Sequence, residues 1–267
     1  MFDSGVGGLT VLHECLVSLP HEDWVYLGDT ARFPYGTRSR KQLAGFAREL
    51  AGVLLDRGAK LLVVACNSAT AAALPALRQE LEERVSVVTV VGPEARQAAR
   101  ATRSGRVGLV ATPATVASGT YETELSRATD GRSELHAVAA PELASIIQAG
   151  GEVDERTVGC VEEACAPLRE ANVDTVILGC THYPLVRPVL QRELGRDVAI
   201  VSSGEAIASD VEAALRVRGS ENERDRRGDY RFLATGDPHE FSRLGTRFLQ
   251  LPIGEVRHVD VRKAAAA

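Results

Sequence analysis

Two cysteines stand at equivalent places in the sequence and could together move a proton. Cys66 ends the apolar run LLVVAC and Cys180 ends TVILGC, and each is followed by Asn or Thr where a helix is expected to begin. A helix N-terminus offers free backbone N–H groups and a positive dipole end, which stabilise a thiolate. A buried, inert thiol is the alternative for either cysteine alone. Two cysteines at matching positions favour acid/base or nucleophilic chemistry.

Each of these cysteines has a candidate ionisable neighbour. His182 follows Cys180 by two residues, and Asp3 opens the glycine-rich segment DSGVGG, so either group could tune the pKa of a thiol. A capping or hydrogen-bonding role is the alternative for both. The glycines suggest close approach of the backbone to a ligand, but Thr10 stands where the dinucleotide fingerprint requires glycine. We therefore expect no nucleotide cofactor.

The other cysteines, Cys15, Cys160 and Cys165, lie inside helical patterns without zinc-site spacing, and we interpret them as packing residues. No metal site is expected. The segment GDTARFPYG at 28–36 is rich in polar and turn residues after a strand-like run. It fits a loop that faces a substrate and equally an ordinary strand-to-helix turn.

The segments that must position these residues alternate between two patterns. Helical patterns cover 39–58, 69–84, 154–172 and 237–249. Short apolar runs typical of buried strands occupy 24–29, 61–66, 85–92, 106–112, 135–140, 175–180, 197–204, 230–236 and 256–261. This alternation predicts an α/β fold with mostly parallel sheets.

The cysteine segments 61–70 and 176–185 resemble each other and lie about one small domain apart. In open α/β sheets the ligand crevice lies beyond the carboxyl ends of the strands. We therefore expect two domains that each contribute one cysteine to a shared cleft.

Composition narrows the classes of function. The chain has 267 residues with a net charge of -5, which argues against a nucleic-acid-binding face, although a local site can still attract an anionic substrate. No run approaches 18 consecutive apolar residues, and the N-terminus lacks the basic and apolar regions of a signal peptide. We expect a cytoplasmic protein without a membrane partner.

Taken together, the segments DSGVGGLTV, GDTARFPYGTRS, ACNSATA and GCTHYP, in this order and spacing, resemble bacterial glutamate racemases from residue 2 to about residue 211. The resemblance implies a racemase without metal or organic cofactor, whose D-glutamate is used for peptidoglycan. It implies two similar doubly wound, mostly parallel-sheet domains with the active site in the cleft between them. The first domain would comprise 1–92 plus 203–267 and the second 93–202.

The resemblance also assigns roles. Cys66 and Cys180 would be the two acid/base thiols, the first acting on D-glutamate and the second on L-glutamate, with Asp3 and His182 as their supporting groups. Donors around the α-carboxylate would include Asn67, Ser68 and Thr181. The residues that match the family's substrate contacts are Asp3, Ser4, Tyr35, Gly36, Asn67, Ser68, Thr181 and His182.

Three positions depart from the family pattern. Ser68 replaces a usual Thr but keeps the hydroxyl, and Gln148 replaces a Glu near the cleft, which removes a charge. Met1 immediately precedes the Phe-Asp-Ser motif, where the family has several apolar residues. We therefore expect weakened anchoring of Asp3, and expect residues upstream in the reading frame to improve it.

Other functions remain open at this stage. The two-cysteine pattern also fits a racemase of another amino acid or of a hydantoin. A catalytically weak binding protein, such as the DNA gyrase partners reported in this family, is a second alternative. A thiol-disulfide oxidoreductase is disfavoured because the sequence has no Cys-x-x-Cys motif. The expected partner is a small molecule, glutamate, and the chain could form a homodimer.

Overall fold

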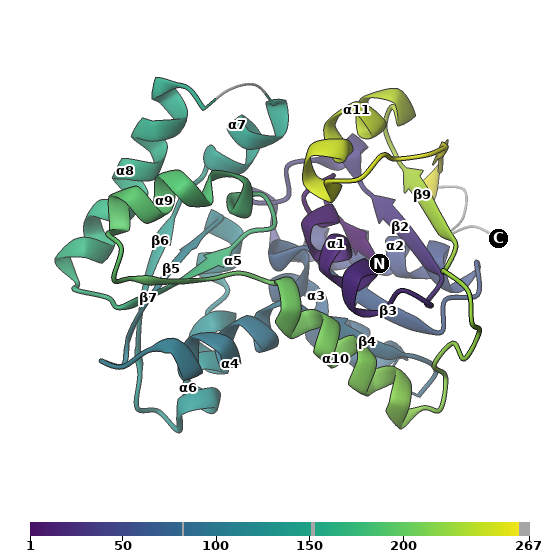
Figure 1. Cartoon of the computed structure of the whole chain (residues 1–267), viewed down its shortest axis with the longest axis horizontal. Helices are drawn as coiled ribbons and strands as arrows, with labels where there is room; N and C mark the ends of the chain where they lie inside the picture. Colours follow the sequence, from purple (N-terminus) through teal and green to yellow (C-terminus); the bar gives the residue numbers. More distant parts are fainter. Residues whose placement is uncertain (82, 151–152, 262–267) are drawn as a thin grey trace.

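A computed structural model describes residues 1–81, 83–150 and 153–261. In these residues the chain forms two parallel β-sheets, of six and four strands, placed side by side and flanked by helices (Figure 1). Every strand pairing within them is parallel. The expected α/β class with mostly parallel sheets is confirmed.

The six-stranded sheet has the order β10 (Val256–His258), β9 (Tyr230–Ala234), β2 (Trp24–Gly28), β1 (Phe2–Asp3), β3 (Leu61–Val64) and β4 (Ser86–Thr89). Its helices are α1 (Leu9–Ser18), α2 (Arg40–Leu55), α3 (Asn67–Leu81), α10 (Gly204–Val217) and α11 (Pro238–Leu249). α1 packs on α10 and α11, whereas α2 packs on α3 (Figure 1). We call this group the six-stranded unit.

The four-stranded sheet has the order β6 (Glu134–Ala139), β5 (Arg106–Ala111), β7 (Thr175–Gly179) and β8 (Ala199–Val201). Its helices are α4 (Val91–Ala101), α5 (Pro113–Ala117), α6 (Thr120–Thr129), α7 (Leu143–Ala149), α8 (Glu155–Glu170) and α9 (Arg187–Leu194). α8 and α9 cover one side of the sheet and α4 and α6 the other (Figure 1). We call this group the four-stranded unit.

The two sheets repeat one winding order. In the six-stranded sheet β1 lies between β2 and β3, and β4 lies next to β3. In the four-stranded sheet β5 lies between β6 and β7, and β8 lies next to β7. In each unit the winding direction therefore reverses next to the first strand, and ligands bind at such switch points. Cys66 follows β3 and Cys180 follows β7, the matching strands of the two units. The repetition inferred from the cysteine segments is thus confirmed by topology.

Local sequence explains where the expected helices begin. Ser39 caps α2 with a capping box completed by Gln42, and the carboxylates of Asp154 and Asp237 cap α8 and α11. Cys15 and Cys165 are fully buried on the core faces of α1 and α8, and Cys160 of α8 is partly buried against the core. Their interpretation as packing residues fits these positions.

The chain crosses from the six-stranded to the four-stranded unit between β4 and α4 and returns between β8 and α10. α10 then packs against α1, β4 and α4, so it contacts both units near the crossing (Figure 1).

The expectation that Asp3 would be poorly anchored is wrong. Phe2 pairs with Leu27 of β2 and Val64 of β3, and Asp3 pairs with Gly28, so even two residues of β1 are held from both sides. The α-amino group of Met1 is buried and donates to the Val25 carbonyl at 2.8 Å. Desolvation lowers the pKa of this amino group to about 5.

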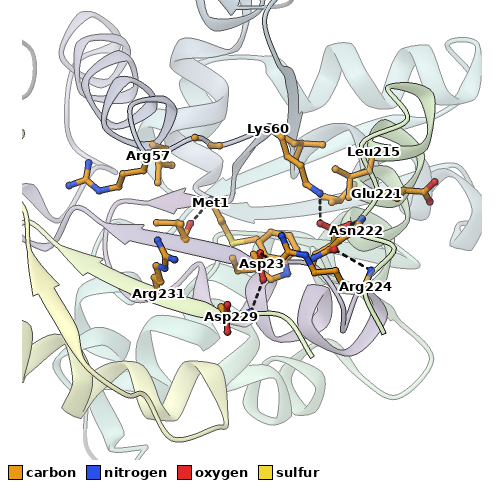
Figure 2. Close-up of a pocket in the computed structure, with 18 residues that line it drawn as sticks. Met1, Asp23, Arg57, Lys60, Leu215, Glu221, Asn222, Arg224, Asp229 and Arg231 are labelled. Carbon is orange, nitrogen blue, oxygen red and sulfur yellow. Dashed lines mark hydrogen bonds and ion pairs between the residues drawn. The ribbon is translucent and has the colours of Figure 1, made fainter. Parts of the chain in front are cut away.

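β2 and β3 both begin ahead of the first residue of β1. β2 and β3 start at Trp24 and Leu61, three residues ahead of the partners of Phe2, and β1 has no residues opposite them. A cavity of about 490 Å³ opens there (Figure 2), lined by Met1 and by the starts of both strands, with charged residues such as Arg57 at its rim.

Among the described residues, no helix is long and apolar enough to cross a membrane.

Candidate active site

The switch points of the two sheets meet at one small cavity. Its volume is about 20 Å³, which is room for about one water molecule. It is lined by Ser4, Phe33, Pro34, Tyr35, Gly36, Thr37, Cys66, Asn67, Ser68, Thr112, Pro141, Ala144, Cys180, Thr181 and His182. All the site residues expected from sequence are among them except Asp3, which precedes Ser4 in the chain and is fully buried.

Cys66 reaches the cavity from the six-stranded unit at the N-terminus of α3. Its carbonyl accepts from the Thr70 N–H at 2.9 Å, and its sulfur accepts from the Ala69 N–H at 3.4 Å, so it caps the helix. Burial and the nearby charge of Asp3 nevertheless raise the pKa of this thiol to about 12. In the closed site the increase in the pKa caused by desolvation is larger than the decrease caused by the helix N-terminus. This is contrary to the expectation of a stabilised thiolate.

Cys180 reaches the cavity from the four-stranded unit, where β7 leads into a short 3-10 helix, Tyr183–Val186, rather than directly into an α-helix. Burial raises the pKa of its thiol well above the usual range. Its sulfur lies 3.8 Å from Nδ1 of His182. The thiol and the imidazole are therefore direct neighbours.

His182 is held by Gln148 of α7. Nε2 of the imidazole lies 2.9 Å from Oε1 of Gln148, and since a carbonyl oxygen only accepts, Nε2 carries the proton. Burial lowers the pKa of His182 to about 3, so the ring is neutral at physiological pH. Its unprotonated Nδ1 is left to accept a proton from Cys180. Gln148 thus provides the hydrogen-bond acceptor for His182 that the family's Glu would provide, but it carries no charge.

Asp3 is tied to both units. Its Oδ1 accepts from the Gly5 N–H at 2.8 Å, and its Oδ2 accepts from the Thr181 hydroxyl at 3.3 Å. Burial raises the pKa of the carboxyl to about 6, so it can hold or release a proton near neutral pH. Its charge also raises the pKa of Cys66.

The amide of Asn67 is oriented by buried partners. Its Nδ2 donates to the Tyr121 hydroxyl at 2.6 Å and to Oε2 of Glu94 at 3.2 Å. Its Oδ1 has no hydrogen-bond partner within the described ranges. Asn67 therefore presents an acceptor rather than the donor that sequence reasoning expected near the α-carboxylate.

Hydroxyl groups bridge the two units beside Asn67. The Ser68 hydroxyl lies 2.8 Å from that of Thr112 and 3.2 Å from that of Thr115. Thr112 follows β5, at the switch point of the four-stranded sheet, and lines the cavity. Sequence reasoning missed it, although its place at the end of the predicted strand 106–112 was the available signal.

The 28–36 segment faces the cavity through its last residues. Tyr35 is buried and donates its hydroxyl to Oδ2 of Asp29, a carboxylate that also accepts from Thr235 at 2.7 Å. The Tyr35 hydroxyl is thus occupied by protein, and Tyr35 anchors the loop. The Gly36 carbonyl, next to the cavity, accepts from the Ala114 N–H of the four-stranded unit at 2.9 Å. We call this contact between residues 33–37 and 112–117 the mouth of the site.

The glycines after Asp3 serve packing. A Cβ on Gly7 would lie 2.4 Å from the His182 ring and 2.5 Å from the Thr181 hydroxyl, and a Cβ on Gly5 would lie 2.6 Å from Oε1 of Gln148. The close approach predicted toward a ligand is therefore an approach to the other unit's site residues. These contacts require glycine.

In the described part of the chain, no group of three or more His, Cys, Asp or Glu side chains could hold a metal ion. The chemistry available at the cavity is that of its two thiols, its imidazole, its carboxyl and its hydroxyl groups.

Known proteins have similar sequences and similar folds. Residues 11–211 match the family described as Asp/Glu/Hydantoin racemase. The chain is 41% identical over 261 residues to a glutamate racemase of Listeria monocytogenes, covering 98% of this chain and 97% of that one. It superposes on glutamate racemase isoform RacE1 of Bacillus anthracis with a TM-score of 0.91 and 38% identity, over 97% of this chain and 96% of the other.

A second solved structure, the Francisella tularensis glutamate racemase in complex with D-glutamate, has a TM-score of 0.90 and 29% identity, over 98% and 97% of the two chains. The match covers both units and both cysteine segments. The chain belongs to the Asp/Glu/hydantoin racemase family.

Proposed function

We propose that this protein interconverts L- and D-glutamate by a two-thiol mechanism and so supplies D-glutamate for peptidoglycan synthesis. The observation that carries the proposal is that Cys66 and Cys180 enter one cavity from the matching strands of two repeated units. Full-length similarity to glutamate racemases supports glutamate as the substrate.

Racemisation requires a base on one face of Cα and an acid on the other. One cysteine, as thiolate, takes the Cα proton, and the other thiol donates its proton to the opposite face of the carbanion. One thiol gains a proton and the other loses one, so the two exchange states with each turnover. Solvent exchange then restores the starting form. By the family pattern, Cys66 takes the proton from D-glutamate and Cys180 takes it from L-glutamate.

Neighbouring groups prepare the thiols for these roles. The unprotonated Nδ1 of His182 lies 3.8 Å from the Cys180 sulfur and can take its proton, and Asp3, whose charge acts on Cys66, can take the proton of that thiol. A substrate ammonium group entering the cavity adds positive charge and lowers the pKa of both thiols. The thiols of the empty site are therefore protonated, and a thiolate forms only once substrate is bound.

The bound substrate is expected to contact the residues that line the cavity. Ser4 and Gly36 can bind the carboxylates, together with Ser68 and backbone N–H groups that stabilise the carbanion. The Thr181 hydroxyl can join them by exchanging its hydrogen bond to Asp3 for one to the substrate. Asn67 offers its oxygen to the ammonium group. Tyr35 positions the loop rather than the substrate.

We further infer that the two units are domains, residues 1–92 plus 203–267 and residues 93–202, with the site in the cleft between them. The strand assignments support these boundaries, since the strands of the six-stranded sheet lie in 2–89 and 230–258 and those of the four-stranded sheet in 106–201.

The test is circular dichroism of an L-glutamate solution over time with purified protein, with L-aspartate and a hydantoin as competing substrates. Loss of signal with L-glutamate at the highest kcat/KM is the expected result. Faster loss with L-aspartate or the hydantoin would assign the chain to another substrate of the family, and no loss with any of them would contradict racemase activity.

Variants test the mechanism directly. Cys66→Ser and Cys180→Ser should each lower kcat by about 10²- to 10⁴-fold, since each removes one acid/base group. Cys15→Ser is the matched control, because that thiol is buried in α1 away from the cavity. Substantial racemisation by either active-site variant would exclude the two-thiol mechanism. Homodimer formation and the absence of nucleic-acid binding stay predictions.

A further inference from the structure

Glu94 is a buried carboxyl that the mechanism above does not use. It lies in the first turn of α4, directly after the chain crosses from the six-stranded to the four-stranded unit, and its side chain is fully buried. A buried carboxyl is costly unless hydrogen-bonded donors surround it. The groups that surround this buried carboxyl should therefore show what it does.

The donors around Glu94 come from three separate places. Oε2 accepts from the Tyr121 hydroxyl of α6 and from Nδ2 of Asn67, while Oε1 accepts from the hydroxyl of Ser203, in the segment where the chain returns to the six-stranded unit. One carboxyl thus joins both crossing segments to a residue of the active site. Each partner acts as a donor, as an ionised carboxylate requires.

The consequence for Asn67 is a fixed orientation. A side-chain amide can turn over to exchange its oxygen and nitrogen, and Glu94 and Tyr121 accept only if the nitrogen faces them. The oxygen then remains the free atom of the amide, and Asn67 lines the catalytic cavity. A free oxygen accepts from a donor, and the donor on an amino acid is its α-ammonium group.

We propose that Glu94 is a positioning residue that holds the Asn67 amide with its oxygen toward the substrate and thereby selects ligands that carry an α-ammonium group. The inference deepens the proposed function and rests on it for the identity of the substrate. Glu94 touches no substrate atom and acts through Asn67.

The experiment compares L-glutamate with glutarate, which has both carboxylates but no ammonium group, by titration calorimetry. Glu94→Leu should weaken L-glutamate binding at least tenfold and change glutarate binding less than twofold. Glu94→Gln should restore most of the L-glutamate affinity, because its carbonyl oxygen can still accept from Asn67 while its amide nitrogen turns to Ser203. Glu22→Leu is the matched control, since Glu22 is a buried carboxyl that pairs with Lys60 beside the other cavity.

A double-mutant cycle checks the route through Asn67. In an Asn67→Ala background, Glu94→Leu should cause no further loss of L-glutamate affinity. If Glu94→Leu fails to fold, Tyr121→Phe is the second variant, because it removes the hydroxyl that accepts from Asn67 and should show the same selective loss.

Equal weakening of L-glutamate and glutarate, or full additivity with Asn67→Ala, would overturn the positioning role. If the wild-type protein racemises no glutamate at all, the proposed function has failed. If it racemises glutamate and the Glu94 variants bind like wild type, only this inference has failed.

Discussion

At the scale of single residues, burial controls the chemistry of the site. The same closed cavity raises the pKa of Asp3 to about 6 and of Cys66 to about 12, and lowers that of His182 to about 3. In each case the charged form is disfavoured because water is excluded. At neutral pH the two thiols and the imidazole of the empty site are therefore uncharged, whereas Asp3 is largely ionised, and the charges of the substrate set the working state of the site.

Gln148 tests how much charge the site needs. Gln148→Glu keeps the acceptor for Nε2 of His182 and adds a negative charge, which should raise the pKa of His182 from about 3. Because the thiols carry the substrate proton, turnover should change less than tenfold. Circular dichroism kinetics and an NMR titration of the histidines measure the two effects. If the wild-type protein were inactive and Gln148→Glu fully active, the carboxylate at this position would be essential.

Glu94 should leave a signature in the pH dependence of stability. Burial raises its pKa from 4.5 to about 7, so between these values the folded state holds a proton that the unfolded state has released. Its contribution to stability is complete below pH 4.5 and is lost as pH rises to 7. Glu94→Gln cannot titrate, so its Tm relative to wild type should rise between pH 4.5 and pH 8.

The difference in Tm between wild type and Glu94→Gln reports the titration of Glu94 alone. Tyr121 from α6 and Cys180 after β7 are the titratable groups that interact with it, while Asn67 and Ser203 carry no charge. Tyr121 and Cys180 have raised pKa values and stay protonated over this range. A Tm difference that does not change with pH would contradict a raised pKa for Glu94.

At the scale of elements, the close packing of the two units depends on backbone positions without a side chain. Gly7→Ala would place a Cβ 2.4 Å from the His182 ring, so the variant should be destabilised and should lose most activity. Gly45→Ala is the matched control, since no atom lies within 4 Å of its Cβ position inside α2. It should gain about 1 kcal/mol of stability from helix propensity. Thermal unfolding and racemisation assays compare the two variants.

The start of β1 is a second place where packing between elements can be tested. A variant with three apolar β-branched residues added before Met1 should extend β1 between the starts of β2 and β3 (Figure 2). Burial of even one such side chain is worth about 2 kcal/mol, and the extension also removes the buried amino group. The Tm should rise by several degrees. A Gly-Ser-Gly extension of equal length is the control, and equal Tm values for both would contradict strand extension.

Sequence patterns predicted the elements well because each carries a local signal. Strands such as β5 and β7 are continuous apolar runs, and Ser39 marks the start of α2. β1 was misjudged because its stability comes from β2 and β3 on either side rather than from its own length. Likewise the two cysteines were visible in the sequence, whereas the Glu94 network joins four segments and has no local pattern.

At the scale of the whole molecule, the cavity is too small for its expected substrate. About 20 Å³ holds one water molecule, so glutamate can enter only if the units separate or the loops at the mouth move. The mouth is closed by backbone contact between the units, where the Ala114 N–H donates to the Gly36 carbonyl. If the units separate, we expect the hinge to lie in the two crossing segments, beside Glu94 and Ser203.

Hydrogen exchange should report this opening. In the free protein, the amide of Ala114 should exchange through opening of the mouth, faster than amides of the buried strand β3. Bound glutamate stabilises the closed state and should slow exchange in 33–37 and 112–117 by about the factor by which its concentration exceeds the Kd, without changing β3. Mass spectrometry of peptides from both regions measures the effect, with glutarate as the second ligand. Unchanged exchange at saturating glutamate would mean that the mouth does not open by separation of the units, and that side-chain rearrangement alone admits the substrate.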